Sequence, residues 1–208
     1  MFDAHYHLPA THEGILCTSK RSEWASLDSI TSPAIIPSLG WLPPARKPTV
    51  DELETRLSSH PSWQIGEVGL DKRFPNEDEQ ETFLLDCLTL AKAYHRFVTL
   101  HCVHADGLLL SIIDGSIPTL WHGFTGSLES ARAFARKGGV LSFGPRLMKT
   151  KLWSRLEDIA DLPYLLETDE SGEKNDISLW RKTFSQRLNL SDEALDAHLT
   201  QSFRLLAW

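Results

Sequence analysis

Two histidines separated by one residue, His5 and His7, follow a short apolar run near the start of the chain. Residues i and i+2 of a β-strand project to the same side, so a strand that continues through this pair would offer both imidazoles to one metal ion. Histidines with this spacing also occur by chance on protein surfaces. The pair therefore indicates a metal site only if further ligand-type residues are brought to the same place.

Four further residues with metal-binding side chains follow apolar, strand-like runs later in the chain: Glu67, His101, His122 and Asp169. Neutral imidazoles suit zinc and other first-row metals, and a central carboxylate can bridge two ions. The complete set of four histidines and two carboxylates is more than one tetrahedral ion needs. Two divalent ions about 3.5–4 Å apart, whether zinc, manganese or magnesium, would clamp the oxygens of a hydrolysis and lower the pKa of a bridging water.

Eight short β-type runs predict the strands that must position these residues. The runs are apolar and nearly continuous, and they cover residues 1–5, 14–18, 34–39, 64–69, 97–101, 118–122, 140–143 and 164–167. Helical patterns lie between or after them, at residues 49–60, 83–91, 106–113, 127–138, 147–159, 177–187 and 191–206. Apolar strands that alternate with helices indicate a parallel sheet covered by helices.

The count of eight strand units predicts an α/β fold, a compact (β/α)8 TIM-type barrel with some helices short or missing. We expect it to form one domain over residues 1–208. In such barrels the active site gathers at the C-terminal ends of the strands. All six ligand candidates lie at or just past those predicted ends, which chance placement does not readily explain.

The composition limits the compartment and the partners. The chain has 41% hydrophobic and 24% charged residues, which is typical of a globular protein. Its three cysteines lack a C-x-x-C spacing, and we find no membrane-length apolar run or secretory signal, so we expect a cytoplasmic protein. The net charge of −7 disfavours a broad basic face for nucleic acid. No membrane association and no obligate protein partner is evident.

Five motifs make the sequence resemble the TatD-like metal-dependent hydrolases, within the wider amidohydrolase-type barrels. In chain order they are FDAHYHL at residues 2–8, IGEVGLD at 65–71, LH at 100–101, HGFTGS at 122–127 and LETD at 166–169. The GEVGLD and ETD runs are the most specific of these. The resemblance extends from the first residues to Asp169 and so covers nearly the whole chain.

The resemblance implies a role for each ligand candidate. It implies that the first ion is bound by His5, His7, Glu67 and Asp169, and the second by His101 and His122 with Glu67 as the bridge. Asp169 would also orient or deprotonate the attacking water, so that Asp169 and Glu67 are the implied catalytic residues. The family is associated with hydrolysis of phosphodiester bonds in DNA, with divalent metal as cofactor.

The sequence departs from the family pattern around these ligands. The arginine usual two residues after the fifth-strand histidine is replaced by Val103, with His104 beside it. The histidine expected after the third strand is replaced within the loop that contains Trp41, while Asn175 could match a family asparagine. These departures leave the metal site intact and place the substrate in doubt.

Three functions therefore remain open. The first is a divalent-metal phosphodiesterase or deoxyribonuclease, acting on DNA or a smaller phosphoester. The second is a hydrolase of a small-molecule amide, ester or phosphomonoester, which the net charge and the missing arginine favour. The third is a non-catalytic barrel that binds metal, which complete retention of six ligand candidates disfavours.

Several neighbouring residues receive more ordinary interpretations. We interpret Glu167 as structural and directed away from the cluster, and Asp71 as an acceptor that fixes its loop. Ser127 is interpreted as a helix N-cap. Trp41 and Trp121 could line the mouth of the site and stack on a base.

Overall fold

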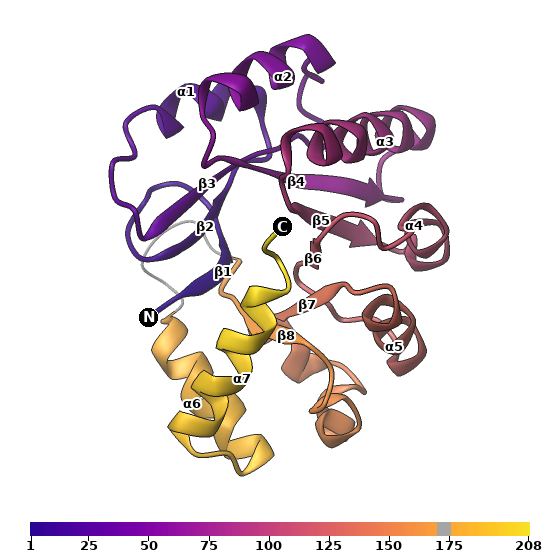
Figure 1. Ribbon diagram of the computed structural model, residues 1–208. Helices are drawn as coiled ribbons and strands as arrows, with labels where there is room; N and C mark the ends of the chain where they lie inside the picture. Colours follow the sequence, from indigo (N-terminus) through magenta and orange to yellow (C-terminus); the bar gives the residue numbers. More distant parts are fainter. Residues whose placement is uncertain (170–175) are drawn as a thin grey trace.

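Eight short strands form one parallel sheet in which each strand pairs with the next along the chain (Figure 1). They are β1 (Asp3–Tyr6), β2 (Gly14–Cys17), β3 (Ile35–Leu39), β4 (Gln64–Asp71), β5 (Val98–Val103), β6 (Thr119–Trp121), β7 (Val140–Phe143) and β8 (Tyr164–Leu166). The computed structural model describes residues 1–169 and 176–208, so the predicted counterpart of a family asparagine, Asn175, lies outside the described residues. All eight predicted strands are present, and the prediction of a (β/α)8 barrel is confirmed.

The helices surround the sheet, and several are short, as the chain length led us to expect (Figure 1). They are α1 (Trp24–Leu27), α2 (Val50–Ser59), α3 (Glu77–Tyr94), α4 (Asp106–Ile112), α5 (Leu128–Arg136), α6 (Ile177–Leu188) and α7 (Asp192–Arg204). The helix predicted over 147–159 is wrong: two 3-10 segments, Pro145–Lys149 and Trp153–Ile159, replace it, and Arg155 has non-helical dihedral angles. Among the described residues, no helix is long and apolar enough to cross a membrane.

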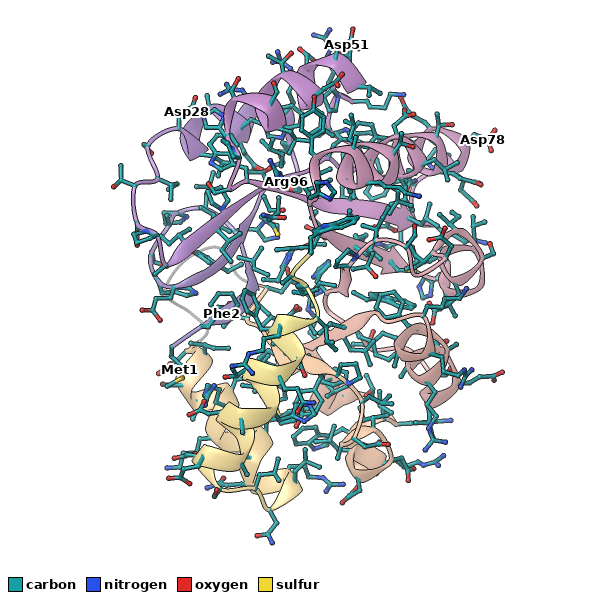
Figure 2. The ribbon with its side chains drawn as sticks, viewed as in Figure 1. Met1, Phe2, Asp28, Asp51, Asp78 and Arg96 are labelled. Carbon is teal, nitrogen blue, oxygen red and sulfur yellow. The ribbon has the colours of Figure 1, made fainter. Side chains whose placement is uncertain are left out.

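Local capping interactions fix where the helices begin. The Thr49 hydroxyl accepts a hydrogen bond from the Glu52 backbone N–H (3.2 Å), and the Glu52 carboxylate accepts one from the Thr49 N–H (2.9 Å), which forms a capping box. Ser127 caps α5 in the predicted way. Asp51 and Asp78 lie in the first turns of α2 and α3 at the outside of the molecule (Figure 2), where their charge suits the helix dipole.

The chain end closes one mouth of the barrel. The residues that follow α7 cross the centre of the barrel (Figure 1), and the buried Leu206 packs in a cluster with Ala4, Ile15 and Leu120. The Trp208 ring lies 5.0 Å from the ring of His95, which lies three residues before the start of β5. The apolar plug therefore occupies the N-terminal mouth and leaves the C-terminal ends of the strands for chemistry.

A buried carboxylate joins the first strand to the last. Asp3 accepts hydrogen bonds from the Thr168 backbone N–H (3.0 Å), the Thr168 hydroxyl (2.6 Å) and the His5 N–H (3.1 Å). The ring of His12 adds a contact to the second oxygen at 3.1 Å. Across the same seam, the Asp169 N–H donates to the His5 carbonyl (3.0 Å). These bonds hold the two ends of the sheet together directly below the ligand candidates.

Replacing this carboxylate should destabilise the whole barrel. We expect Asp3→Ala to lower the free energy of unfolding by at least about 3 kcal/mol, because each buried donor left without a partner costs about 1–3 kcal/mol. Urea unfolding followed by circular dichroism would measure it. The control is Asp28→Ala, which removes an exposed ion pair with Arg56 and should cost about 1 kcal/mol or less. Equal effects of the two substitutions would contradict the seam role of Asp3.

Candidate metal centre

The six ligand candidates converge at the C-terminal ends of the strands. Their positions are His5 in β1, His7 just after β1, Glu67 in β4, His101 in β5, His122 just after β6, and Asp169 three residues after β8. Side chains of His5, Glu67 and His122 are buried, whereas those of His7, His101 and Asp169 are partly accessible from the rim. The fold thus brings together all six residues that the sequence singled out.

Four of these side chains direct one donor atom each toward a common region. His5 Nε2 and His7 Nε2 are 3.2 Å apart. Glu67 Oε2 lies 3.7 Å and 3.4 Å from these two nitrogens, and Asp169 Oδ1 lies 3.7 Å and 3.6 Å from them. A tetrahedral ion with bonds of about 2.0–2.2 Å holds its ligand atoms about 3.3–3.6 Å apart. His5, His7 and Glu67 thus form one group that could hold a divalent ion, and Asp169 lies beside both histidines of that group.

The other oxygen of Glu67 faces the remaining two histidines. Glu67 Oε1 lies 2.5 Å from His101 Nδ1 and 2.7 Å from His122 Nε2, and the two nitrogens are 3.1 Å apart. These three atoms form a second group that could hold an ion. Each Glu67 oxygen therefore belongs to a different group, so that this carboxylate joins the two groups.

Burial and charge shift the pKa values of the cluster in opposite directions. Burial lowers the pKa of His5 well below its usual value, and the charge on His122 lowers it further. Burial alone would also lower the pKa of His122, but the carboxylates of Glu67 and Glu167 raise it to about 10. Burial would raise the pKa of Glu67, yet His122 and His101 hold it well below its usual range. A metal that binds His122 Nε2 must therefore displace a proton.

Two carboxylates outside the ligand set contact its histidines. Asp71 accepts a hydrogen bond from the Arg73 N–H (3.0 Å), as its loop-fixing interpretation predicted, and its other oxygen lies 3.3 Å from His101 Nε2. Glu167 is fully buried and lies 3.6 Å from His122 Nδ1. The interpretation that Glu167 points away from the cluster is therefore wrong. Residues 167 and 169 are two apart, and this spacing was the signal that could have placed them on one side.

Two arginines that the sequence did not single out also reach the rim. The Arg146 guanidinium pairs with Asp169, and the Arg73 guanidinium pairs with Asp71 (2.5 Å). Both arginine side chains are largely exposed, at 71% and 60%. Although burial alone would raise the pKa of Asp71, its hydrogen bonds with Arg73 contribute to lowering it to about 2. Arg73 and Arg146 therefore bring positive charge to the rim from the loops after β4 and β7, whereas the position of the family arginine is occupied by the uncharged Val103.

The two tryptophans that we expected at the mouth of the site do not lie where they could stack on a substrate. Trp41 is 2% exposed, and its indole N–H donates to the Ala45 carbonyl (2.7 Å). Trp121 is equally buried and packs edge-on against Phe124. The expectation that these two rings line the site mouth is therefore wrong, because both serve the core. His104 is exposed beyond β5, in the left-handed region (φ 58°).

A pocket of ≈ 350 Å³ opens onto one side of the cluster. Glu67, His101 and Asp71 form its polar floor, Lys20 and Arg73 contribute its positive charge, and its apolar wall consists of Leu42, Pro43, Pro44, Ala45 and Phe74. A larger cavity of ≈ 510 Å³ lies between β8 and α7, and none of the six ligand candidates lines it. The smaller pocket is therefore the better candidate for a substrate.

Relatives of this chain include two uncharacterised metal-dependent hydrolases. YjjV of Escherichia coli (strain K12) is 33% identical over 136 residues, which are 58% of this chain and 51% of that protein. MJ1582 of Methanocaldococcus jannaschii is 26% identical over 106 residues, or 50% of this chain and 43% of that protein. The aligned part of this chain thus spans about half the length of these relatives.

Solved structures share the barrel over nearly its full length. The crystal structure of YjjV, a TatD homologue from Escherichia coli, superposes with a TM-score of 0.80 at 22% identity, covering 99% of this chain and 97% of that one. A TatD family hydrolase from Entamoeba histolytica gives 0.69 at 14% identity, covering 97% and 84%. The family model described as TatD related DNase matches residues 13–196, a range that includes Glu67, His101, His122 and Asp169. On that match, the chain belongs to the TatD related DNase family.

Proposed function

We propose that this protein is a divalent-metal-dependent hydrolase whose six rim residues bind two ions. The observation that carries the proposal is the donor geometry. His5, His7 and Asp169 lie on one side of Glu67, with distances of 3.2–3.7 Å in this group, and His101 and His122 lie on the other side. His5 Nδ1 and His122 Nδ1 have no hydrogen-bond partner among the described residues, and their rings are oriented with Nε2 toward the cluster. Uncharacterised relatives described as metal-dependent hydrolases support the same reading.

Glu67 and Asp169 would have different roles in the reaction. When bound, divalent ions would polarise the scissile bond and lower the pKa of the attacking water. Glu67 would stay charged between the two ion positions, because the neighbouring divalent cations would favour its ionised form. Asp169, which is partly exposed at the rim and held by its backbone bond to His5, would take a proton from that water.

A phosphodiester, with DNA as the leading case, is the proposed substrate class. The description of the family as TatD related DNase supports it. Arg146 adds a physical reason, because it can contact a phosphate oxygen when metal takes over the charge of Asp169. Arg73 lines the neighbouring pocket, where its guanidinium adds positive charge. The positive charge missing at Val103 would thus be supplied from two other loops.

A small-molecule amide, ester or phosphomonoester is the second candidate. The pocket of ≈ 350 Å³ with its wall of prolines and aliphatic residues favours it, since that volume suits a small ligand. A substrate panel separates the two. Single-stranded DNA, small phosphodiesters, phosphomonoesters and amides would be tested with Zn²⁺, Mn²⁺ and Mg²⁺, and with a chelator. We expect metal-dependent cleavage of phosphodiesters; cleavage of amides alone would refute the phosphodiesterase assignment.

Arg146 provides a sharper test of the substrate charge. We expect Arg146→Ala to lower kcat/KM for a phosphodiester about 10- to 100-fold, because a charge-assisted contact contributes about 1.5–3 kcal/mol. The effect on a neutral ester should be small. The control is Arg155→Ala, which removes a nearby exposed arginine paired with Asp158. Equal losses on charged and neutral substrates would argue against a phosphate contact.

A further inference from the structure

The two histidines on the Oε1 side of Glu67 present opposite ring nitrogens to it. His101 uses Nδ1, at 2.5 Å from Glu67, whereas His122 uses Nε2, at 2.7 Å. A neutral imidazole has one bare nitrogen and one N–H, so each ring can serve as a ligand only in the tautomer that leaves the inner nitrogen bare. For His101 the proton must then be on Nε2, and for His122 it must be on Nδ1.

Each outer nitrogen faces a buried carboxylate. His101 Nε2 lies 3.3 Å from Asp71 Oδ2, and His122 Nδ1 lies 3.6 Å from Glu167 Oε1. Glu167 is fully buried, and neither of its carboxylate oxygens has a hydrogen-bond partner within the part of the chain that the structure describes. Gly123 and Gly144 border this carboxylate, so no side chain from those positions competes for it. A buried carboxylate needs a donor, and His122 Nδ1, also unpartnered, is the group that faces it.

We propose that Asp71 and Glu167 are positioning residues that impose opposite tautomers on His101 and His122, so that both rings turn a bare nitrogen toward one ion. This inference rests on the proposed metal centre. The carboxylates accept the outer N–H of each ring, fix its orientation and make its inner nitrogen a better donor. Glu167 is fully buried and does not line the pocket, whereas Asp71 lies in the pocket and acts here through His101.

The two carboxylates should not contribute equally. Asp71 already has the guanidinium and the backbone N–H of Arg73 as partners, so His101 is only one of its donors. Glu167 has His122 alone to satisfy it among the described side chains. For His7, on the other side of Glu67, a backbone carbonyl can accept the outer N–H instead of a carboxylate, because His7 Nδ1 lies 3.0 Å from the Cys17 oxygen. Loss of Glu167 should therefore weaken metal binding more than loss of Asp71.

The test uses the intact protein loaded with Zn²⁺. Nitrogen-15 NMR of the histidine rings should show the proton on Nε2 of His101 and on Nδ1 of His122. Calorimetric titration with Zn²⁺ should show one of two binding steps weakened about 10- to 100-fold in Glu167→Ala. Glu167→Gln should recover most of the affinity, because an amide carbonyl still accepts the N–H. Glu157→Ala, which removes an exposed carboxylate paired with Arg187, is the control and should bind as the wild type does.

The possible outcomes separate this inference from the proposed function. Wild-type affinity for both ions in Glu167→Ala, or the same protonated nitrogen in both rings, would overturn the inference. If the tautomers and the affinity change are as expected but no phosphodiester is cleaved, the positioning role stands and the substrate assignment fails. If the wild type takes up no Zn²⁺, both are overturned. Should Glu167→Ala fail to fold, the titration of Asp71→Ala decides, because loss of the His101 partner should weaken one binding step, and wild-type affinity for both ions would overturn the inference.

Discussion

Asp169→Asn should lower the rate of hydrolysis about 10²- to 10⁴-fold, the usual contribution of a positioned general base, while most of the metal stays bound. The amide keeps an oxygen that can serve as a ligand, but it cannot take a proton from the attacking water. The backbone should not change, because residue 169 has φ 53° and asparagine is among the residues that best tolerate this region. Its backbone hydrogen bond to His5 is also independent of the side chain.

The measurement needs both a rate and a metal count. We expect kcat to fall while metal per chain, measured by atomic emission, stays close to the wild-type value. Asp161→Asn is the control, since Asp161 is an exposed aspartate in the turn before β8. Near-normal turnover in Asp169→Asn would exclude its role as the base. Loss of metal in parallel with activity would attribute the fall in rate to the ligand role of Asp169 and not to a role as the base.

The fold was predictable because its strands are buried on both sides. The residues of apolar runs such as 97–101 and 140–143 are enough by themselves to predict strands. The segment 147–159 was predicted wrongly because its buried residues Leu152, Leu156 and Ile159 have the i, i+4, i+7 spacing of an α-helix. Two 3-10 segments and the residues between them bury the same side chains, and periodicity does not distinguish them from one kinked helix.

The ligand candidates were predictable for a topological reason. Parallel strands all end at one rim, so His101 and His122, at the ends of successive strands, had to meet. No comparable rule predicts which side chains reach the ligand candidates from loops. Arg146 follows β7 in a 3-10 segment, and its contact with Asp169 depends on how that loop folds. Trp41 was misjudged because an aromatic residue in a proline-rich loop can face the solvent or, as here, the core.

Glu67 is the residue whose loss should change the metal centre most. Each of its oxygens lies within 3.7 Å of two histidines, one pair on each side. We expect Glu67→Ala to lose one or both ions, with activity falling at least as far as in Asp169→Asn. The barrel should still fold, because the backbone bonds of residue 67, from its N–H to the Thr18 carbonyl and from the Trp41 N–H to its own carbonyl, do not involve the side chain.

Metal stoichiometry is the deciding measurement for this variant. Equilibrium dialysis against Zn²⁺ should give about two ions per chain for the wild type, the number expected for a bridged pair, and one or none for Glu67→Ala. The control is Glu77→Ala, which removes an exposed glutamate in the first turn of α3. Two ions bound at wild-type affinity would refute the bridge, because the two groups of histidines would then hold their ions independently. If one ion is retained, ring NMR would show which pair of histidines binds it more tightly. The His5–His7 pair would keep Asp169 as a further ligand. The His101–His122 pair would keep only its two imidazoles.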